Sequence, residues 1–258
     1  MVFRSLTRTF AQRTVLLMED IPSIFFKDVK VIAFDADDTL WDCQSWFDKV
    51  EERYCELLSP WCTPEEVARE LFATESRNMP LTGYGVKAFT LSLVENAINI
   101  SQGRIGAQLL LEIQRLGLTL LSLPATPLPG VEETLNRLRQ MQRFQLAVFT
   151  KGEIQDQEGK LLRSGLWPLF DRVVVVADKT ERQYRELCSL FGIQMNQLLM
   201  VGNSFKSDIE PVLKLGGRAI HIPFHTTWAH EQTIEYKHHN LLVFSKMEEI
   251  TEVLLIPN

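Results

Sequence analysis

An apolar stretch of this sequence ends directly in a group of carboxylates. Residues 31–34, Val-Ile-Ala-Phe, have the character of a buried strand, and Asp35, Asp37, Asp38 and Thr39 follow them. Carboxylates that are drawn toward a protein interior lose solvation, so they stay charged only if a cation partners them. The stretch therefore predicts a crevice in which carboxylates meet a cation and can act in catalysis.

Five short apolar runs are continuous rather than alternating, which is typical of parallel strands covered on both faces. They are residues 29–34, 145–150, 172–177, 198–202 and 218–222. Helical patterns separate the last four runs, at 153–163, 181–191 and 207–215. The repetition of strand, helix and strand predicts an α/β fold with a Rossmann-like, doubly wound parallel sheet.

About 110 residues separate the first predicted strand from the second, which is far more than a normal crossover needs. Four segments within them have helical apolar spacing, at 45–59, 64–73, 86–99 and 104–121, and prolines and glycines, including Pro80, separate these segments. We therefore expect three parts: an N-terminal extension of residues 1–25, an α/β core of 26–42 and 125–258, and an all-helical insertion of 43–124.

The first residues leave two interpretations open. Arg4, Arg8 and Arg13 occur among Ser and Thr with no acid before Glu19, as in an organellar transit peptide. A floppy extension, or an over-long gene start with Met18 as the true initiator, explains the segment better. The four cysteines form no CxxC pair and no zinc spacing, so we expect reduced thiols and a cytoplasmic protein.

Polar residues lie at the ends of the first four predicted strands, where ligands bind in open parallel sheets. Besides the first carboxylates, they are Thr150, Lys151, Lys179, Asn203, Ser204, Ser207 and Asp208. Because the carboxyl ends of parallel strands meet at one edge, these side chains are expected to surround a single crevice. A single Thr or Lys at the end of a strand would not indicate a site, but polar residues at the ends of four successive strands do.

Four segments resemble, in order, the motifs of the haloacid dehalogenase superfamily. They are "DADDT", "FTKG", "DKTERQY" and "GNSFKSD", and the resemblance covers nearly the whole chain. It implies a phosphatase-type hydrolase in which the helical insertion is a cap that closes over the crevice and selects the substrate. The fourth motif departs from the usual pattern, since Asn203 stands where the family more often has a metal-binding Asp.

The resemblance also implies roles for individual residues. Asp35 would be the nucleophile, Lys179 would neutralise it, and Asp37 would act as general acid and base with a raised pKa. Mg²⁺ would bind Asp35, Asp208 and the backbone carbonyl of Asp37. Phosphate and substrate contacts are expected from Thr150, Lys151, Asn203 and, in the cap, Tyr84, which lies in the glycine-flanked "TGYG".

The presence of Asp37 favours a phosphatase over a dehalogenase, because a departing halide needs no proton. The predicted function is a Mg²⁺-dependent phosphatase that hydrolyses a small phosphorylated metabolite, a nucleotide or sugar phosphate, through an aspartyl-phosphate. A phosphotransferase of the mutase kind and a non-catalytic phosphate-binding member remain alternatives. The net charge of −6 shows no excess of Lys and Arg of the kind that binds nucleic acid, so we expect no nucleic-acid partner. No apolar run is long enough to span a membrane. The sequence leaves the oligomeric state open.

Overall fold

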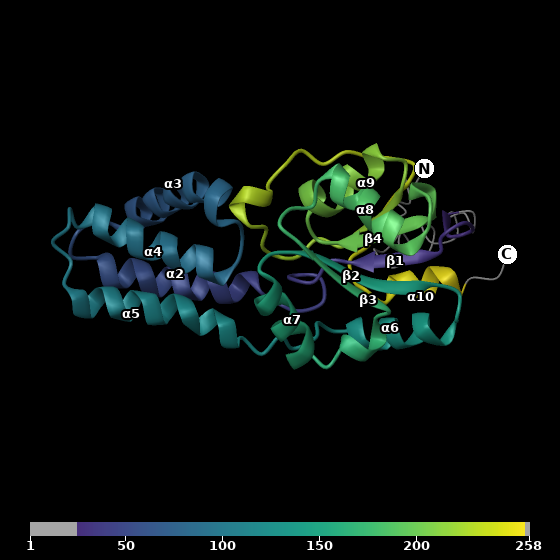
Figure 1. The fold of residues 1–258 in the computed structure, drawn as a ribbon, viewed down its shortest axis with the longest axis horizontal. Coiled ribbons are helices and arrows are strands. Elements are labelled where there is room, and N and C mark those ends of the chain that lie inside the picture. Colours follow the sequence, from purple (N-terminus) through teal and green to yellow (C-terminus); the bar gives the residue numbers. More distant parts are fainter. Residues whose placement is uncertain (1–24, 256–258) are drawn as a thin grey trace, which may run out of the picture.

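The protein is described by a computed structural model that covers residues 25–255 in detail. Its core is a six-stranded parallel sheet with the strand order β3-β2-β1-β4-β5-β6 (Figure 1). The strands are β1 Val31–Phe34, β2 Gln145–Lys151, β3 Arg172–Val176, β4 Leu198–Gly202, β5 Arg218–His221 and β6 Leu241–Val243. The predicted α/β fold with a doubly wound parallel sheet is confirmed.

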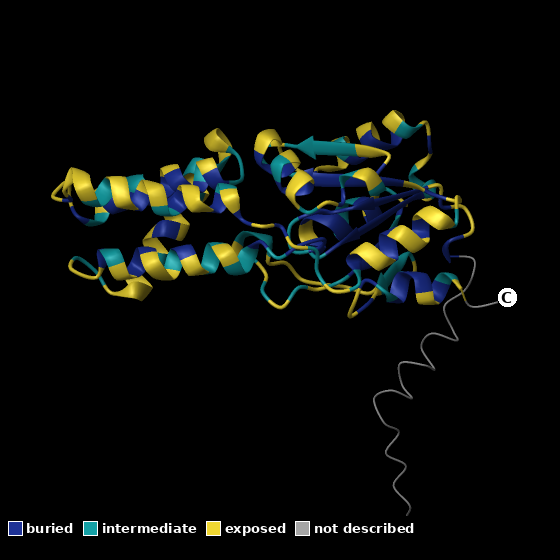
Figure 2. Ribbon diagram, turned by 90° about the horizontal axis from the view of Figure 1, so that it is seen from below, coloured by how far each residue is buried: buried dark blue, intermediate teal, exposed yellow. Residues whose placement is uncertain are grey.

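Helices cover both faces of this sheet, which is why its strands are apolar without alternation. In β1, Ile32 and Phe34 join one buried cluster, whereas Val31 and Ala33 join another on the opposite face. The first cluster includes residues of α6 Val131–Gln140, α7 Ile154–Arg163 and α10 Glu249–Leu254, and the second includes residues of α8 Glu181–Phe191 and α9 Glu210–Lys214. The central strands β1, β2, β4 and β5 are accordingly drawn mostly as buried in Figure 2, whereas the edge strands β3 and β6 are less buried.

The long connection between β1 and β2 forms a separate layer of helices at one end of the molecule (Figure 1). These helices are α2 Gln44–Leu58, α3 Pro64–Thr82, α4 Val86–Ile100 and α5 Ala107–Leu118. They enclose an apolar cluster of their own. Inside it the Tyr54 hydroxyl donates to the Leu93 carbonyl (2.9 Å) and accepts from the Asn96 amide (2.9 Å), so the buried polar groups are satisfied.

Two local expectations were wrong, and one strand was not predicted. Helix α3 continues through Pro80 to Thr82 instead of ending near residue 73, because a proline in the last turn disturbs few helical hydrogen bonds. The predicted helix 207–215 begins earlier, as a π-helix over Phe205–Ile209 that leads into α9. Strand β6 was not predicted, since it has only three residues, at the edge of the sheet.

Residues 1–24 lie outside the part of the chain that the structure describes. The predicted N-terminal extension, residues 1–25, therefore falls outside it as well, except for Phe25. Within residues 25–255, none of the helices combines the length and the apolar character that crossing a bilayer requires.

Two helical glycines provide a matched test of packing. A Cβ on Gly117 in α5 would lie 2.5 Å from the Thr90 hydroxyl of α4, whereas a Cβ on Gly159 in α7 would meet only the flexible end of Arg163, at 3.1 Å. We expect Gly159→Ala to stabilise the fold by about 0.5–1 kcal/mol through helix propensity. Gly117→Ala should instead destabilise it by about 1–3 kcal/mol, because overpacking outweighs the propensity gain. Urea denaturation of both variants measures this, and equal stabilisation by both would contradict the close packing of α4 and α5.

Candidate active site

One pocket joins the carboxyl end of the sheet to the helical insertion. Its lining contains every residue that the sequence singled out as catalytic, metal-binding or substrate-binding: Asp35, Asp37, Tyr84, Thr150, Lys151, Lys179, Asn203 and Asp208. Residues separated by up to 173 positions (35 to 208) therefore meet at one place. The expected convergence of these side chains is present.

Asp35 is held directly beyond the end of β1. Its N–H donates to the Val201 carbonyl of β4 (2.9 Å), which continues the pairing of the two strands, and its carboxylate forms a buried ion pair with Lys179. The Thr39 hydroxyl lies 3.2 Å from the second carboxylate oxygen. Burial raises the pKa of Asp35 to about 7 despite the Lys179 ammonium. The carboxylate is thus positioned, poorly hydrated and paired, as a nucleophile requires.

Asp208 shares the same ammonium. Lys179 Nζ lies 2.7 Å from its carboxylate, which also accepts the N–H of Ser204 (3.0 Å). Burial raises the pKa of Asp208 as well, against the opposing effect of Lys179. Only a glycine fits beside it, since a Cβ at Gly202 would lie 2.2 Å from an Asp208 oxygen. The glycine of the fourth motif therefore has a packing reason in this chain.

Asn203 is joined to Asp35 through the Thr39 hydroxyl. The Thr39 hydroxyl accepts the N–H of Asn203 (3.1 Å) and lies 3.1 Å from the Asn203 side-chain oxygen. The Asn203 carbonyl oxygen therefore lies in the same polar network as the Asp35 carboxylate. An amide oxygen at this place provides a neutral ligand where a carboxylate would provide a charge.

The donor set around Asp35 suits a hard divalent cation. Two buried carboxylates, Asp35 and Asp208, face a single buried ammonium, so the group carries a net negative charge. Within residues 25–255, no group of three or more His, Cys, Asp and Glu side chains is arranged to hold a metal ion by itself. Mg²⁺ fits these conditions, because it prefers oxygen ligands and usually keeps several waters.

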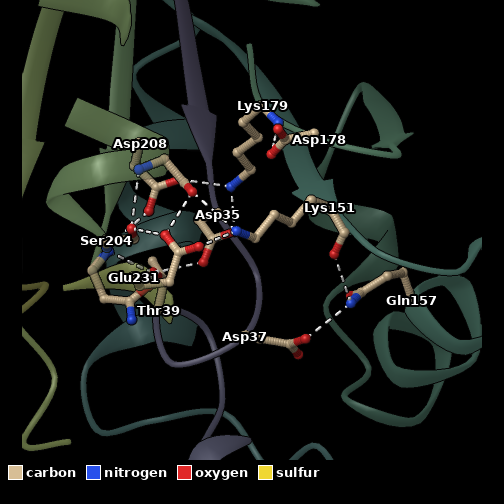
Figure 3. A network of polar contacts seen from close by, with 12 residues as sticks. Asp35, Asp37, Thr39, Lys151, Gln157, Asp178, Lys179, Ser204, Asp208 and Glu231 are labelled. Carbon is tan, nitrogen blue, oxygen red and sulfur yellow. Dashed lines mark hydrogen bonds and ion pairs between the residues drawn. The ribbon is translucent and has the colours of Figure 1, made fainter. Parts of the chain in front are cut away.

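The Asp37 carboxylate points away from Asp35 and Lys179 (Figure 3). Lys160 Nζ lies 2.8 and 2.7 Å from its two oxygens, and Trp41 Nε1 (2.8 Å) and Gln157 Nε2 (2.9 Å) also donate to it. Burial favours the protonated form, but Lys160 and these hydrogen bonds outweigh it and hold the pKa of Asp37 below its ordinary value. The expectation of a raised pKa is wrong for this conformation, in which Asp37 is ready to accept a proton rather than to donate one.

Lys160 and Gln157 are site residues that the sequence analysis missed. Lys160 is 2% exposed and pairs with Asp156 (3.4 Å) as well as with Asp37. Gln157 joins Asp37 to the backbone carbonyl of Lys151 (3.3 Å). The available signal was a run of polar residues on one face of the helix that follows the second motif, at positions 156, 157 and 160.

Asp38, the third carboxylate of the opening stretch, has a structural role. It adopts a positive φ of 61°, and its carboxylate accepts the N–H groups of Cys43 (2.8 Å) and Gln44 (2.9 Å). These amides lie at the start of α2, where backbone N–H groups lack partners within the helix. Asp38 therefore fixes the direction in which the chain leaves the core for the insertion.

Lys151 is turned toward a residue that no motif predicted. Its ammonium forms a partly buried ion pair with Glu231, lies 3.0 Å from the Ser207 hydroxyl, and is 4.4 Å from the ring centroid of Tyr84. Thr150, its neighbour, is 2% exposed and lines the pocket. Glu231 gave no signal in the sequence because it lies 23 residues beyond the last motif residue, Asp208, in a segment without periodicity.

Two carboxylates line the part of the pocket that belongs to the insertion. Glu51 of α2 and Glu75 of α3 have no hydrogen-bond or ion-pair partner among the residues that the structure describes. Burial, with a smaller effect from Glu51, raises the pKa of Glu75 to about 7. Burial and Asp48 raise the pKa of Glu51. This end of the pocket therefore resists a further negative charge.

The raised pKa of Glu75 predicts a pH dependence of stability. The protonated form is favoured on folding, so the stabilisation is complete below pH 4.5 and is lost as the pH rises from 4.5 to about 7. Glu75→Gln cannot ionise, so its free energy of unfolding should rise relative to wild type over this range by at most about 3 kcal/mol. Denaturant titrations at several pH values measure it, with Glu70→Gln as a control for the loss of an exposed charge on the same helix. A difference that does not change with pH would contradict the burial of Glu75.

Comparisons with known proteins identify the family of this chain. The sequence model of the haloacid dehalogenase-like hydrolases matches residues 29–216. A haloacid dehalogenase-like family hydrolase from Xanthomonas campestris has 30% identity and a TM-score of 0.78, over 88% of this chain and 92% of that one. No curated protein matches.

More distant solved structures share the fold. A predicted phosphoglycolate phosphatase from Haemophilus somnus has 19% identity and a TM-score of 0.58, over 88% of this chain and 99% of that one. A 2-haloacid dehalogenase from Pseudomonas syringae has 19% identity and a TM-score of 0.57, over 88% and 98%. The magnesium-bound putative hydrolase YfnB from Bacillus subtilis has 17% identity and a TM-score of 0.59, over 89% and 100%. The match of the family model to most of the chain, together with the motif residues that meet in one pocket, shows that this protein belongs to the haloacid dehalogenase-like hydrolases.

Proposed function

We propose that this hydrolase is a Mg²⁺-dependent phosphatase that acts on a small phosphorylated metabolite through an aspartyl-phosphate. The observation that supports it most is that two neighbouring carboxylates, Asp35 and Asp37, have different lysine partners and different surroundings. Asp35 is buried beside Lys179, whereas Asp37 is held by Lys160 in an ionised state. A nucleophile and a separate proton carrier are the two groups that phosphate ester hydrolysis requires.

In the first step an Asp35 carboxylate oxygen attacks phosphorus, and the bond between phosphorus and the ester oxygen breaks. The leaving alkoxide takes a proton from Asp37. Lys179, whose Nζ lies between Asp35 and Asp208, offsets the negative charge on the nucleophile and the phosphoryl group. Thr150, which is buried near the end of β2 and lines the pocket, would donate its hydroxyl to a phosphoryl oxygen.

In the second step water attacks phosphorus, the bond between phosphorus and Asp35 breaks, and Asp37 accepts the proton of that water. The products are inorganic phosphate and the free Asp35 carboxylate. The hydrogen bonds to Asp37 from Lys160, Gln157 and Trp41 keep it ionised, and by stabilising the carboxylate they also lower its affinity for a proton. Both proton transfers therefore require that the Asp37 side chain leave these partners and turn toward Asp35. Asp37 takes up a proton from solvent before the first turnover, and the proton that it accepts in the second step serves the next one.

Mg²⁺ would be held by oxygen atoms of Asp35 and Asp208 and by the backbone carbonyl of Asp37, with Asn203 as a neutral neighbour. When bound, it would neutralise charge on the phosphoryl group and orient it. The chain's own contribution is to hold these oxygens in a buried position, through Thr39 on one side and the Ser204 N–H on the other.

The fold alone does not separate a phosphatase from a dehalogenase, because the similar structures include both kinds of protein. Asp37 favours the phosphatase, since an alkoxide leaves as a neutral alcohol only with a proton, whereas a halide needs none. A mutase that passes the phosphoryl group to a second sugar uses the same two carboxylates. Detection of an isomerised sugar phosphate instead of free phosphate would select that alternative.

The proposed substrate carries one phosphate and no second anion near the insertion, because Glu51 and Glu75 line that end of the pocket without cationic partners. Nucleoside monophosphates and simple sugar phosphates meet this condition, whereas bisphosphates do not.

The four described cysteines are all free, which agrees with the proposal that the protein acts in the cytoplasm.

Asp35→Asn tests the covalent route. The variant should lose phosphate release from 4-nitrophenyl phosphate almost completely, because an amide cannot form the acyl phosphate. Removal of divalent ions from the wild type by chelation should have the same effect, reversed by Mg²⁺. Asp28→Asn, at an exposed aspartate just before β1, controls for the loss of a charge elsewhere. Full activity of Asp35→Asn would refute the proposed mechanism, and a wild type inert at every Mg²⁺ concentration would favour the non-catalytic alternative.

Asp37→Asn tests the acid role through the leaving group. The variant should hydrolyse an alkyl phosphate at least about 100-fold more slowly than the wild type, because an alkoxide leaves poorly without a proton. The loss on 4-nitrophenyl phosphate should be much smaller, since nitrophenolate is a stable anion. Steady-state rates on both esters give the comparison. Equal loss on the two esters would show that Asp37 does not protonate the leaving group.

A further inference from the structure

The segment between β5 and β6, residues 222–240, joins two strands of the core and contacts the insertion. It contains one 3-10 turn, Ala229–Glu231, seen in Figure 1 as the yellow-green turn at the boundary between the two parts. Loops of this length within a compact domain are usually functional. Its residues Thr227, Trp228 and Glu231 line the same pocket as the catalytic carboxylates.

Glu231 fixes this segment to the catalytic motifs. Its carboxylate pairs with Lys151 and accepts hydrogen bonds from the hydroxyls of Ser204 and Ser207, the latter at 2.6 Å (Figure 3). The side chains of Lys151 and Glu231 are 15% and 10% exposed. A largely desolvated ion pair of this kind favours one geometry, because breaking it leaves a poorly hydrated charge without its partner.

The segment held by Glu231 brings Trp228 against Tyr84 of the insertion. The two rings meet edge to face, with centroids 5.9 Å apart and planes at 76°. Lys151 Nζ lies 4.4 Å from the Tyr84 centroid and 5.9 Å from the Trp228 centroid. One aromatic wall of the pocket is thus contributed half by the insertion and half by the core.

Two further contacts fix the segment relative to the insertion. The His230 ring stacks on Phe72 of α3 at 4.2 Å, with planes 16° apart, and His225 Nε2 lies 3.3 Å from the Ser45 hydroxyl of α2. Trp228 lies between these two contacts in the chain. The position of Trp228 in the pocket therefore depends both on the contacts of Glu231 with the core and on the contacts of His225 and His230 with the insertion.

We propose that Trp228 is a specificity-determining residue that packs, with Tyr84, against an aromatic or apolar leaving group, and that Glu231 is the positioning residue that holds Trp228 there. Phe47, Met79 and Phe89 extend the apolar lining on the insertion side. Lys151 and Glu231 neutralise each other, so this wall requires no charge on the leaving group. The inference rests on the proposed phosphatase function and narrows its substrates to phosphomonoesters with a flat or apolar alcohol part.

The test compares 1-naphthyl phosphate with ethyl phosphate. In Trp228→Ala the ratio of their kcat/KM values should fall about tenfold relative to the wild-type ratio, mainly through KM for the naphthyl ester, as expected for the loss of apolar contact. Trp228→Phe should restore most of it. Ile234→Ala, at a residue of the same segment that is 88% exposed, is the control and should keep the wild-type ratio. An unchanged ratio in Trp228→Ala would overturn the proposal.

Glu231 is tested by a double-mutant cycle. If Glu231 acts through Trp228, Glu231→Gln should lower the ratio, and the double variant Trp228→Ala/Glu231→Gln should be no lower than Trp228→Ala alone. Additive losses, or a wild-type ratio in Glu231→Gln, would remove the positioning role. Thermal unfolding verifies that each variant is folded, and if Glu231→Gln is not, Glu231→Asp takes its place in the cycle.

A second measurement needs no turnover. Calorimetry in the Asp35→Asn background gives the affinities for 1-naphthyl phosphate and ethyl phosphate, and the ratio of these affinities should fall in Trp228→Ala as the ratio of kcat/KM values does. A wild type that hydrolyses neither ester would refute the proposed phosphatase function, yet the affinity ratio would still decide the role of Trp228. Hydrolysis of both esters with no effect of Trp228→Ala on either ratio would refute this inference alone.

Discussion

The site depends on two buried carboxylates that share one ammonium. Asp35 and Asp208 both contact Lys179, and all three side chains are within the most buried part of the molecule. Such a group is stable only if each charge has partners, and the chain provides them from the Thr39 hydroxyl and the Ser204 N–H. The remaining negative charge is what makes the group suitable for a divalent cation and a phosphoryl group.

A second charged group keeps Asp37, the proposed proton carrier, separate from Asp35, the proposed nucleophile. Lys160 is buried between Asp37 and Asp156, so it retains a carboxylate partner when Asp37 turns away. This arrangement lowers the energetic cost of moving Asp37, because Lys160 is not left alone in the interior. The opposite effects of burial on Asp35 and of Lys160 on Asp37 give two neighbouring aspartates different protonation behaviour.

The insertion is joined to the core by contacts that surround the same pocket. Asp38 fixes the start of α2, Lys87 pairs with Glu153 at 3.2 Å near the start of α7, and the segment 222–240 contacts α2 and α3. Apolar side chains of the insertion, Phe47, Met79 and Phe89, line the same pocket as Asp35 and Asp37. Closure over a buried charged site excludes water, which strengthens the electrostatic interactions inside it. The pocket is therefore lined from both parts, and the proposed specificity belongs to their boundary.

The sequence by itself determined the parallel sheet, the helical insertion and the convergence of Asp35, Thr150, Lys179 and Asp208. These features depend on local patterns, since continuous apolar strands end at one edge and deliver the residues that follow them to one place. Only the tertiary structure revealed Lys160, Gln157 and Glu231, and it reversed the expected pKa shift of Asp37. The direction of a side chain, its burial and its ion-pair partner depend on residues distant in the chain, and no local pattern contains that information.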